Sequence, residues 1–302
     1  MNQPIHIKTI SELHHFAGGD PPDHPLMSIM RVEDIPELPS GFPSEFTFSF
    51  YTIGLKKNLQ GYVEYGRKRY DFQQGVMGFT APNQVMSFDS SSTVGATGWM
   101  LFFHPDLLHG HQLGSNILEF GFFDYEIHEA LHLSPKEEDT ILQVFENIHH
   151  EYHQPIDLYS KSVVLSNVEL LLTYCNRFYG RQFVTRHDAD QTFLSRFEKS
   201  IKTYFREDHN MDQGLPSVNF FADQLNVSPS YLSDSLKALT GRTTQDHIHY
   251  YLLDKAKNIL IGSDKPVSEV AYELGFEYPQ YFSRLFKEKV GMTPKEYRLS
   301  NN

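Results

Sequence analysis

Cysteine is almost absent from this sequence, and so are long apolar runs. The only cysteine, Cys175, cannot form a disulfide within the chain, so packing must hold the fold together and nothing points to an oxidising compartment. No stretch approaches the ~20 uninterrupted apolar residues that a membrane span needs. The first twenty residues also lack the basic flank and apolar run of an export signal. These absences predict a cytoplasmic protein with no membrane association.

Positive charge is scarce as well. The net charge of −12 argues at first sight against nucleic-acid binding, because contacts to phosphates supply most of the affinity for DNA. The acidity is uneven, however, since residues 190–302 carry a net charge of −1 and residues 1–189 carry −11. Within residues 281–302 two acidic side chains face a larger set of basic ones, namely Arg284, Lys287, Lys289, Lys295 and Arg298. A local basic surface is therefore expected in this segment.

Length and composition indicate two folded domains. The chain has 302 residues, of which 40% are hydrophobic and 14% aromatic, and this is the composition of a globular protein rather than a disordered one. Residues 181–194 include a polar stretch without periodicity, which is the best candidate for a linker. We therefore predict an N-terminal domain over residues 1–180 and a C-terminal domain over residues 195–302.

The first part of the N-terminal domain has the pattern of an all-β structure. Between residues 26 and 103, short aromatic and β-branched runs such as Phe46–Tyr51 alternate with turn residues such as Gly75 and Asn83. Several short strands at even spacing favour a small barrel or sandwich.

Helical periodicity begins after Pro105. Apolar residues recur at helical spacing in two segments, the first with Ile141, Val144, Phe145 and Ile148, the second with Val164, Leu165, Val168, Leu171, Leu172 and Cys175. The second set covers an unusually wide arc. It fits either a helix buried in one core or a helix seam between two copies of the chain, and both interpretations remain open.

The C-terminal domain contains an internal repeat. When one segment is shifted by 50 positions, two sets of residues coincide: Tyr231, Leu232, Ser233, Leu236, Lys237, Gly241 and Thr243 match Tyr281, Phe282, Ser283, Phe286, Lys287, Gly291 and Thr293. Each copy has the layout of a helix, a tight turn and a second helix. In both copies a proline, Pro229 or Pro279, stands where the second helix begins, a position at which its missing N–H costs nothing.

A helix-turn-helix unit binds DNA because its second helix fits the major groove. The positions that face outward on the two second helices are therefore candidate DNA contacts: Ser230, Ser233, Asp234 and Lys237 in the first copy, and Gln280, Tyr281, Arg284 and Lys287 in the second. Gln and Arg suit adenine and guanine edges, whereas the lysines suit phosphates. Helical spacing from Ile248 to Leu260 predicts one continuous helix that joins the copies and fixes their separation.

The second copy resembles the signature of AraC/XylS-type transcription regulators. The resemblance rests on Ala271-x-x-Leu274-Gly275-Phe276, on Tyr281-Phe282-Ser283-Arg284-x-Phe286-Lys287, and on Gly291-x-Thr293-Pro294-x-x-Tyr297-Arg298. With the first copy it extends over residues 195–300. The resemblance implies an α+β protein: a cupin-like β-barrel domain with flanking helices for effector binding or dimerisation, and an all-α domain of two helix-turn-helix units.

By resemblance, the function is that of a sequence-specific regulator that binds an operator or promoter in double-stranded DNA. An activator that acts as a homodimer is expected, and repression and a monomer stay open as alternatives. A small-molecule effector and RNA polymerase are further candidate partners. One position departs from the family, because Asp234 stands where a basic residue is common. An acidic side chain is repelled by phosphate unless it accepts from a cytosine amine, so the first copy is expected to bind weakly.

Other chemistry receives less support from the sequence. His109 and His111 form an H-x-H pair with Glu119 downstream, but the pair follows Pro105 and is better explained as a solvated turn than as a metal site. His149 and His153 are spaced i, i+4 on a helix without an identifiable third ligand. We therefore expect no metal, no cofactor and no catalytic constellation.

Three functional classes remain open for the N-terminal domain. It is expected to bind a small molecule within aromatic residues, with Tyr51, Tyr62, Tyr65, Phe79 and Trp99 as candidate contacts, although ordinary core packing explains each of them better. Alternatively, it is a platform for assembly without any effector. The third alternative is a metal-dependent cupin enzyme with a helical appendage.

Overall fold

The computed structural model describes residues 4–35, 45–57, 64–65, 68–69, 75–87, 97–126, 129–186, 191–206 and 214–301. Contacts within the chain separate an N-terminal unit, Met1–Gln182, from a C-terminal unit, Phe183–Asn302. Part of the predicted linker is helical, since α4 (Ser160–Arg186) and α5 (Gln191–Arg206) both extend into residues 181–194. The limits 1–180 and 195–302 remain a proposal. Among the described residues, no helix combines the length and apolar content that crossing a membrane requires.

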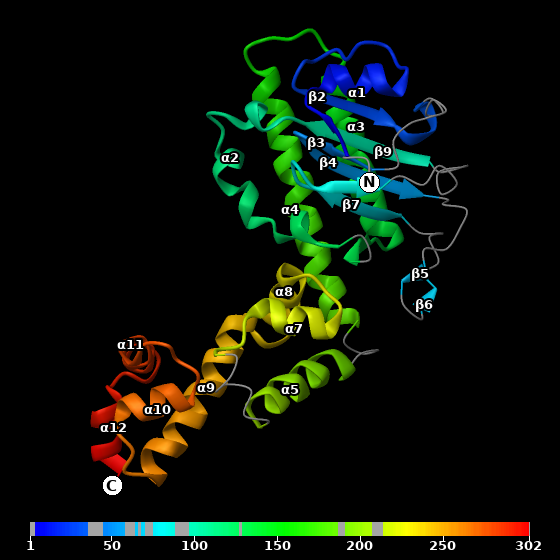
Figure 1. The fold of residues 1–302 in the computed structure, drawn as a ribbon. Coiled ribbons are helices and arrows are strands. Elements are labelled where there is room, and N and C mark those ends of the chain that lie inside the picture. Colours follow the sequence, from blue (N-terminus) through cyan, green and yellow to red (C-terminus); the bar gives the residue numbers. More distant parts are fainter. Residues whose placement is uncertain are drawn as a thin grey trace. The chain divides into compact units, whose positions relative to one another are not determined.

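The N-terminal unit is built on two principal β-sheets (Figure 1). An antiparallel sheet in the order β10, β7, β4, β9, β2 comprises Leu131–His132, Val76–Thr80, Tyr51–Lys57, Thr97–Phe103 and Met27–Arg31. A second sheet in the order β1, β3, β8 comprises Ile5–Ile7, Glu45–Phe48 and Val85–Ser87, and β5 (Glu64–Tyr65) pairs with β6 (Lys68–Arg69). These strands with helices confirm the predicted α+β class.

The sequence predicts a small barrel or sandwich, and the described strands do not close into a barrel. A barrel requires each strand to pair on both sides. Among the described residues, however, β2 pairs only with β9 and β10 only with β7, and no strand of one sheet pairs with a strand of the other. The sheets are therefore open, and apolar side chains fill the space at their edges and faces. One cluster packs the three-stranded sheet and the first helix, α1 (Ile10–Ala17), against β9, and it consists of Ile7, Ile10, Leu13, Phe46, Phe48, Phe50 and Phe102.

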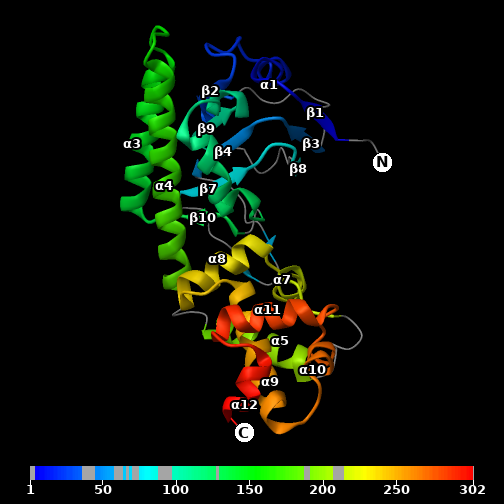
Figure 2. The same ribbon diagram turned by 90° about the vertical axis from the view of Figure 1, so that its left-hand side faces the viewer.

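Two long helices lie along one face of the five-stranded sheet, as Figures 1 and 2 show from two directions. These are α3 (Pro135–Tyr152) and α4, both predicted from their periodicity. Ser134 begins α3 with a capping box to Glu137, and Pro135 occupies the first helical position. The ring of Trp99 on β9 stacks on Phe145 of α3, with 6.1 Å between ring centroids.

The wide apolar arc of α4 is core packing. The side chains of Val164, Leu165, Val168, Leu171, Leu172 and Cys175 are all buried within the chain. They are therefore not available as a seam between two copies. Burial also raises the pKa of the Cys175 thiol far above its usual value, so this cysteine is unreactive in the folded protein.

Short helical segments complete the N-terminal unit: α2 (Gln112–Asn116) and the 3₁₀ turns η1 (Val32–Asp34), η3 (Pro105–Leu108), η4 (Ile117–Glu119) and η5 (Gly121–Asp124). His109 and His111 follow η3. The His109 side chain is exposed, and Nδ1 of His111 accepts the backbone N–H of Leu113 at the start of α2. Both residues therefore belong to a turn and a helix cap, and Glu119 lies in η4.

In its described residues, the C-terminal unit consists of helices joined by short turns and loops, without a strand. After α5 it contains α7 (Val218–Leu225), α8 (Pro229–Thr240), α9 (Thr244–Gly262), α10 (Val267–Glu273), α11 (Pro279–Val290) and α12 (Pro294–Asn301). Their inner faces share one apolar core that includes Phe197, Phe221, Leu232, Leu236, Leu252, Ala271, Phe282 and Phe286. Because they share one core, the two predicted helix-turn-helix copies form one folding unit and not two separate domains.

Candidate nucleic-acid interface

The first helix-turn-helix consists of α7 and α8. Ser217 caps α7 by accepting the N–H of Phe220, and Asn226 ends that helix in the left-handed conformation with φ of 54°. Ser228 then accepts the N–H of Tyr231, and Pro229 opens α8. Each junction follows from local side-chain chemistry, which is why the sequence alone predicts this unit.

The second helix-turn-helix consists of α10 and α11, and its turn is one residue longer. In each copy, a backbone N–H in the turn donates to the carbonyl of an alanine on the first helix: Val227 to Ala222, and Phe276 to Ala271. The equivalent residues of these two hydrogen bonds are 49 positions apart in the sequence, whereas the equivalent prolines, Pro229 and Pro279, are 50 apart. The extra residue lies between the apolar plug, Phe276, and Pro279. Gly275, with φ of 87°, provides the left-handed turn that Asn226 provides in the first copy.

The predicted connecting helix is confirmed as α9. Ile248, Leu252, Ala256 and Leu260 are buried along one side of it, and Thr243 and Asp246 form a capping box at its start. Lys289 of α11 lies 3.5 Å from the carboxylate of Asp246 and lowers its pKa, after the larger effect of the Thr243 hydroxyl. The start of α9 is thereby linked to α11 as well as to α8.

On α11 the four predicted contact residues are all exposed. Gln280, Tyr281, Arg284 and Lys287 lie on the outer side, while Phe282, Leu285 and Phe286 are buried on the inner side. The guanidinium of Arg284 lies over the ring of Tyr281, 4.8 Å from its centroid. This cation–π contact orients a side chain that would otherwise be free to rotate, and it leaves the fork of N–H donors available.

On α8 the corresponding residues are less accessible. Lys237 is exposed, but Ser230, Ser233 and Asp234 are partly buried. The Ser233 hydroxyl donates to Oγ1 of Thr244 at 3.2 Å, inside the unit. Tyr231, the counterpart of the exposed Tyr281, is buried, and its ring contacts Phe183 at 5.1 Å. The two copies therefore share a backbone but present different surfaces.

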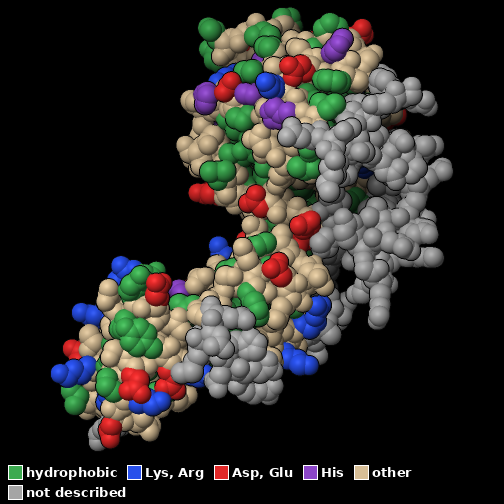
Figure 3. Space-filling view, in the orientation of Figure 1, with side chains coloured by type: hydrophobic (Ala, Val, Ile, Leu, Met, Phe, Trp, Pro, Cys, Tyr) green, Lys and Arg blue, Asp and Glu red, His purple; other side chains and the backbone are tan. Residues whose placement is uncertain are grey.

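The basic surface is smaller than the residue count predicts. Nε and Nη2 of Arg298 donate to the carbonyls of Leu260 and Lys265, at 2.9 and 2.7 Å, so this guanidinium closes the C-terminal end of α9. Lys289 is engaged with Asp246. Arg284, Lys287 and Lys295 remain exposed. Figure 3 shows blue basic side chains interspersed with red acidic ones on this unit. A sequence pattern cannot tell a carbonyl-capping arginine from a phosphate-binding one.

Two histidines on α9 add no positive charge near neutral pH. Burial lowers the pKa of both His247 and His249, and nearby Arg242 and Lys289 lower these pKa values further. Both imidazoles are therefore neutral at pH 7.

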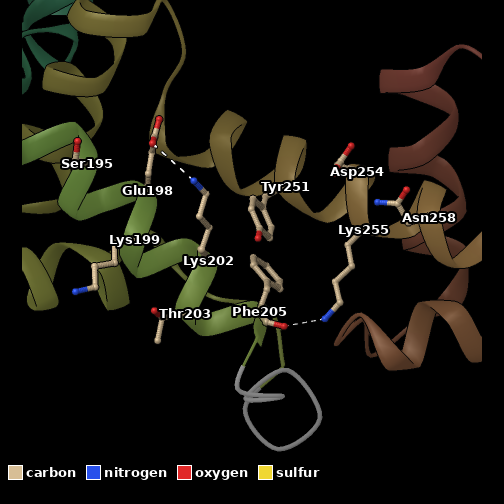
Figure 4. Close-up of a pocket in the computed structure, with 10 residues that line it drawn as sticks. All are labelled: Ser195, Glu198, Lys199, Lys202, Thr203, Phe205, Tyr251, Asp254, Lys255 and Asn258. Atoms are coloured by element: carbon tan, nitrogen blue, oxygen red, sulfur yellow. Dashed lines mark hydrogen bonds and ion pairs between the residues drawn. The ribbon is translucent and has the colours of Figure 1, made fainter.

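A groove of about 680 Å³ lies between α5 and α9, apart from the predicted DNA contacts (Figure 4). The rings of Phe205 and Tyr251 stack at 5.1 Å within it, and Lys199, Lys202 and Lys255 lie around them. Two of the lysines are engaged: Lys255 donates to the Phe205 carbonyl at 2.9 Å, and Lys202 lies 4.0 Å from Glu198. None of the eight predicted DNA contacts lines this groove.

The predicted effector contacts in the N-terminal unit have packing partners. Tyr51 stacks on Phe103, Phe79 contacts Phe122, and Trp99 stacks on Phe145. All three lie on the face of the five-stranded sheet that carries Ile53 and Leu101, as the strand register shows. Tyr65 lies on β5, whose side chains are outside the described set, and Tyr62 lies outside the described residues.

Two helix-turn-helix units joined by one rigid helix define a DNA-binding class of domain. A family described as "Helix-turn-helix domain" matches residues 221–300. Residues 221–300 thus form a helix-turn-helix domain of the AraC/XylS type, whose signature residues lie in the second unit.

Named relatives agree with this assignment. The chain is 25% identical over 187 residues to the "Uncharacterized HTH-type transcriptional regulator YijO" of Escherichia coli, covering 62% of each chain. It is 36% identical over 98 residues to the "MmsAB operon regulatory protein" of Pseudomonas aeruginosa, covering 32% of this chain and 31% of that one. It thus spans less than two thirds of the length of these relatives.

Among solved structures, the C-terminal domain of the response regulator yesN from Fusobacterium nucleatum is 30% identical. The match covers 33% of this chain and 96% of that one, with a TM-score of 0.30.

Proposed function

We propose that this protein is a cytoplasmic, non-enzymatic transcription regulator that reads double-stranded DNA mainly through α11. The observation that carries the proposal is the division of α11 into a buried apolar side and an exposed side with Gln280, Arg284 and Lys287. These exposed types match adenine, guanine and phosphate respectively. The weaker exposure of the α8 residues supports a secondary role for the first unit.

The fixed link through α9 supports simultaneous contact by both units. Recognition helices about one turn of DNA apart, roughly 34 Å, enter successive major grooves on one face of a duplex. We propose that α8 contributes position and phosphate contacts through Lys237, while α11 contributes base recognition. We also propose that the protein forms a homodimer and contacts RNA polymerase. The side chains of Val163 and Leu170, which are exposed and seven residues apart on α4, offer a surface for dimerisation.

Selection of binding sites from a random pool of duplexes tests the proposed function. The purified full chain should enrich a common sequence, and its affinity for that sequence should fall about 10³-fold or more between 50 and 200 mM salt if six or more phosphates are contacted. The N-terminal unit measured alone is the matched comparison. It should show no affinity for DNA, because it is acidic and lacks both helix-turn-helix units. Absence of any salt-sensitive affinity, with or without small molecules, contradicts the proposal.

We further propose that an anionic small molecule regulates the N-terminal unit by binding beside Lys56. Lys57 pairs with Glu138 of α3, so the alternation of β4 places Lys56 on the opposite face of the sheet. Lys56 is partly buried and has no hydrogen bond or ion pair with any residue that the structure describes. Burial lowers the pKa of its ammonium group, and a carboxylate would compensate that cost. On the same face, Gly54 and Gly78 are paired; Met100 covers Gly54, whereas no described residue lies within 4 Å above Gly78.

Thermal unfolding against a panel of mono- and dicarboxylates, with neutral sugars as comparison, tests this second proposal. A carboxylate that raises the Tm of the native protein should have no such effect on Lys56→Met, which keeps the apolar stem and removes the charge. Lys57→Met, on the other face, should keep the response while losing its ion pair. Equal shifts in Tm in both variants contradict the site. If no compound of the panel raises the Tm of the native protein, the N-terminal unit serves only for assembly.

A further inference from the structure

A second polar cluster in the N-terminal unit has no part in the proposed DNA binding. His149 and His153 lie one turn apart on α3, and their Nε2 atoms are 3.1 Å apart. Nδ1 of His153 lies 2.8 Å from Oδ2 of Asp23, which belongs to the segment before β2, 130 positions away in the sequence. The sequence predicts the histidine pair but gives no sign of its carboxylate partner.

The carboxylate determines where the His153 proton lies. A carboxylate oxygen can only accept, so Nδ1 of His153 carries the hydrogen and donates it to Asp23. Nε2 of His153 therefore presents a lone pair toward Nε2 of His149. A histidine that donates one ring N–H to a carboxylate and points its other nitrogen outward is the arrangement found around metal-binding histidines.

The distance between the two Nε2 atoms is also suitable for a shared ion. Two nitrogens bound to Zn²⁺ at about 2.0–2.1 Å, with a roughly tetrahedral angle between them, lie about 3.3 Å apart. The observed 3.1 Å needs only a small opening of the pair. In the absence of an ion, His149 donates its Nε2 hydrogen to His153. On ion binding, His149 takes its other tautomer, with the hydrogen on Nδ1, so no net proton is released.

The surroundings hold the pair in place, and both acidic and basic groups lie around it. The ring of His149 packs on Trp99 at 5.0 Å, and the Tyr152 hydroxyl accepts the N–H of Asp23 at 2.8 Å. Charged groups that act on the pair are Asp23, Asp34 and Glu146, which are acidic, and Arg31, which is basic. Arg31 is itself bonded to Glu146 at 2.8 Å.

We propose that His149 and His153 bind a divalent transition-metal ion, such as Zn²⁺ or Ni²⁺, through their Nε2 atoms, with Asp23 orienting His153. Within the described residues, no group of three or more His, Cys, Asp or Glu side chains converges on one point, so water completes the coordination. Imidazole ligands suit Zn²⁺, Ni²⁺ and Cu²⁺. The ion fastens the segment between α1 and β2 to α3, because Asp23 belongs to that segment and bonds one of the ligands.

Calorimetric titration of the metal-free, tag-free full chain with Zn²⁺ or Ni²⁺ alone tests this site. One ion per chain should bind, and His149→Ala and His153→Ala should each lose at least about 10-fold in affinity. Asp23→Asn keeps an acceptor but loses the charge, and should bind about 10-fold more weakly. His150→Ala is the matched control, since this exposed neighbour on the same helix takes no part in the cluster and its loss should change nothing.

Amide hydrogen exchange gives a second measurement, which reports on the segment that the bound ion should fasten. Saturating Zn²⁺ should slow amide exchange in residues 18–26 of the native chain. In the His149→Ala/His153→Ala double variant, Zn²⁺ should not change the exchange rate of these residues. The proposal is overturned if the double variant binds as the native chain does, or if the native chain binds no ion in the millimolar range. Affinity for DNA in the absence of metal should be the same in all these variants.

Discussion

Replacing Arg284 by alanine should lower the affinity for the selected DNA about 5- to 150-fold, which corresponds to about 1–3 kcal/mol. The physical reason is that Arg284 is exposed on α11 and oriented by Tyr281, so its loss removes a bidentate contact and not a core residue. Titration of labelled duplex at one stated salt concentration measures the effect. Arg284→Lys should recover only part of the affinity, because an ammonium cannot replace the planar fork.

Lys287→Ala provides the contrast for this prediction. Because Lys287 is proposed to contact a phosphate, its loss should weaken binding to all duplexes equally. It should also reduce the slope of log affinity against log salt concentration by about one. Arg284→Ala should instead relax the preference for one base pair. Thermal unfolding should be unchanged in both variants, since both side chains are exposed. Full affinity and unaltered base preference in Arg284→Ala would mean that α11 does not lie in a major groove.

Replacing Phe282 by alanine should destabilise the C-terminal unit by about 3–5 kcal/mol. Phe282 is fully buried, and its ring contacts those of Phe276 and Phe286 at 5.3 and 5.7 Å. The cavity left by the ring would separate the plug of the turn from the helix that follows it. Because typical domains are stable by only about 5–15 kcal/mol, the loss is a large part of the total.

Hydrogen exchange within α10, α11 and α12 during urea titration measures this loss, because it reports the C-terminal unit separately from the rest of a two-unit chain. Tyr281→Ala is the matched control: it removes the adjacent aromatic side chain, which is 54% exposed, and should change stability far less. If both variants unfold at the same urea concentration, then Phe282 does not hold the second helix-turn-helix together.

The C-terminal unit could be predicted from sequence because its boundaries are set by local chemistry. Ser217 and Ser228 cap helices, Pro229 and Pro279 open them, and Gly275 turns the chain, and each of these acts on residues at most a few positions away. The apolar spacing of α9 then predicted the connection. The role of Arg298 could not be predicted, because its acceptors, the carbonyls of Leu260 and Lys265, lie 38 and 33 positions away.

The N-terminal unit was predicted less completely, because its order depends on distant pairs. Alternation and turn residues indicate strands, but the arrangement β10, β7, β4, β9, β2 brings Leu131 beside Met77 and Met27 beside Phe103. Those pairings decide whether a sheet closes, and the barrel prediction failed at that step. The contact of Asp23 with His153 was missed for the same reason.

The unequal turns of the two helix-turn-helix units show how tandem copies can diverge without unfolding. An insertion of one residue inside a helix would rotate everything beyond it by about 100° around the axis and would move apolar side chains into solvent. Placed between Phe276 and Pro279, the same insertion leaves both flanking helices in register with the core. The direction in which α11 points can therefore change together with its turn, and this alters which DNA sequence is bound as directly as a change of its side chains does.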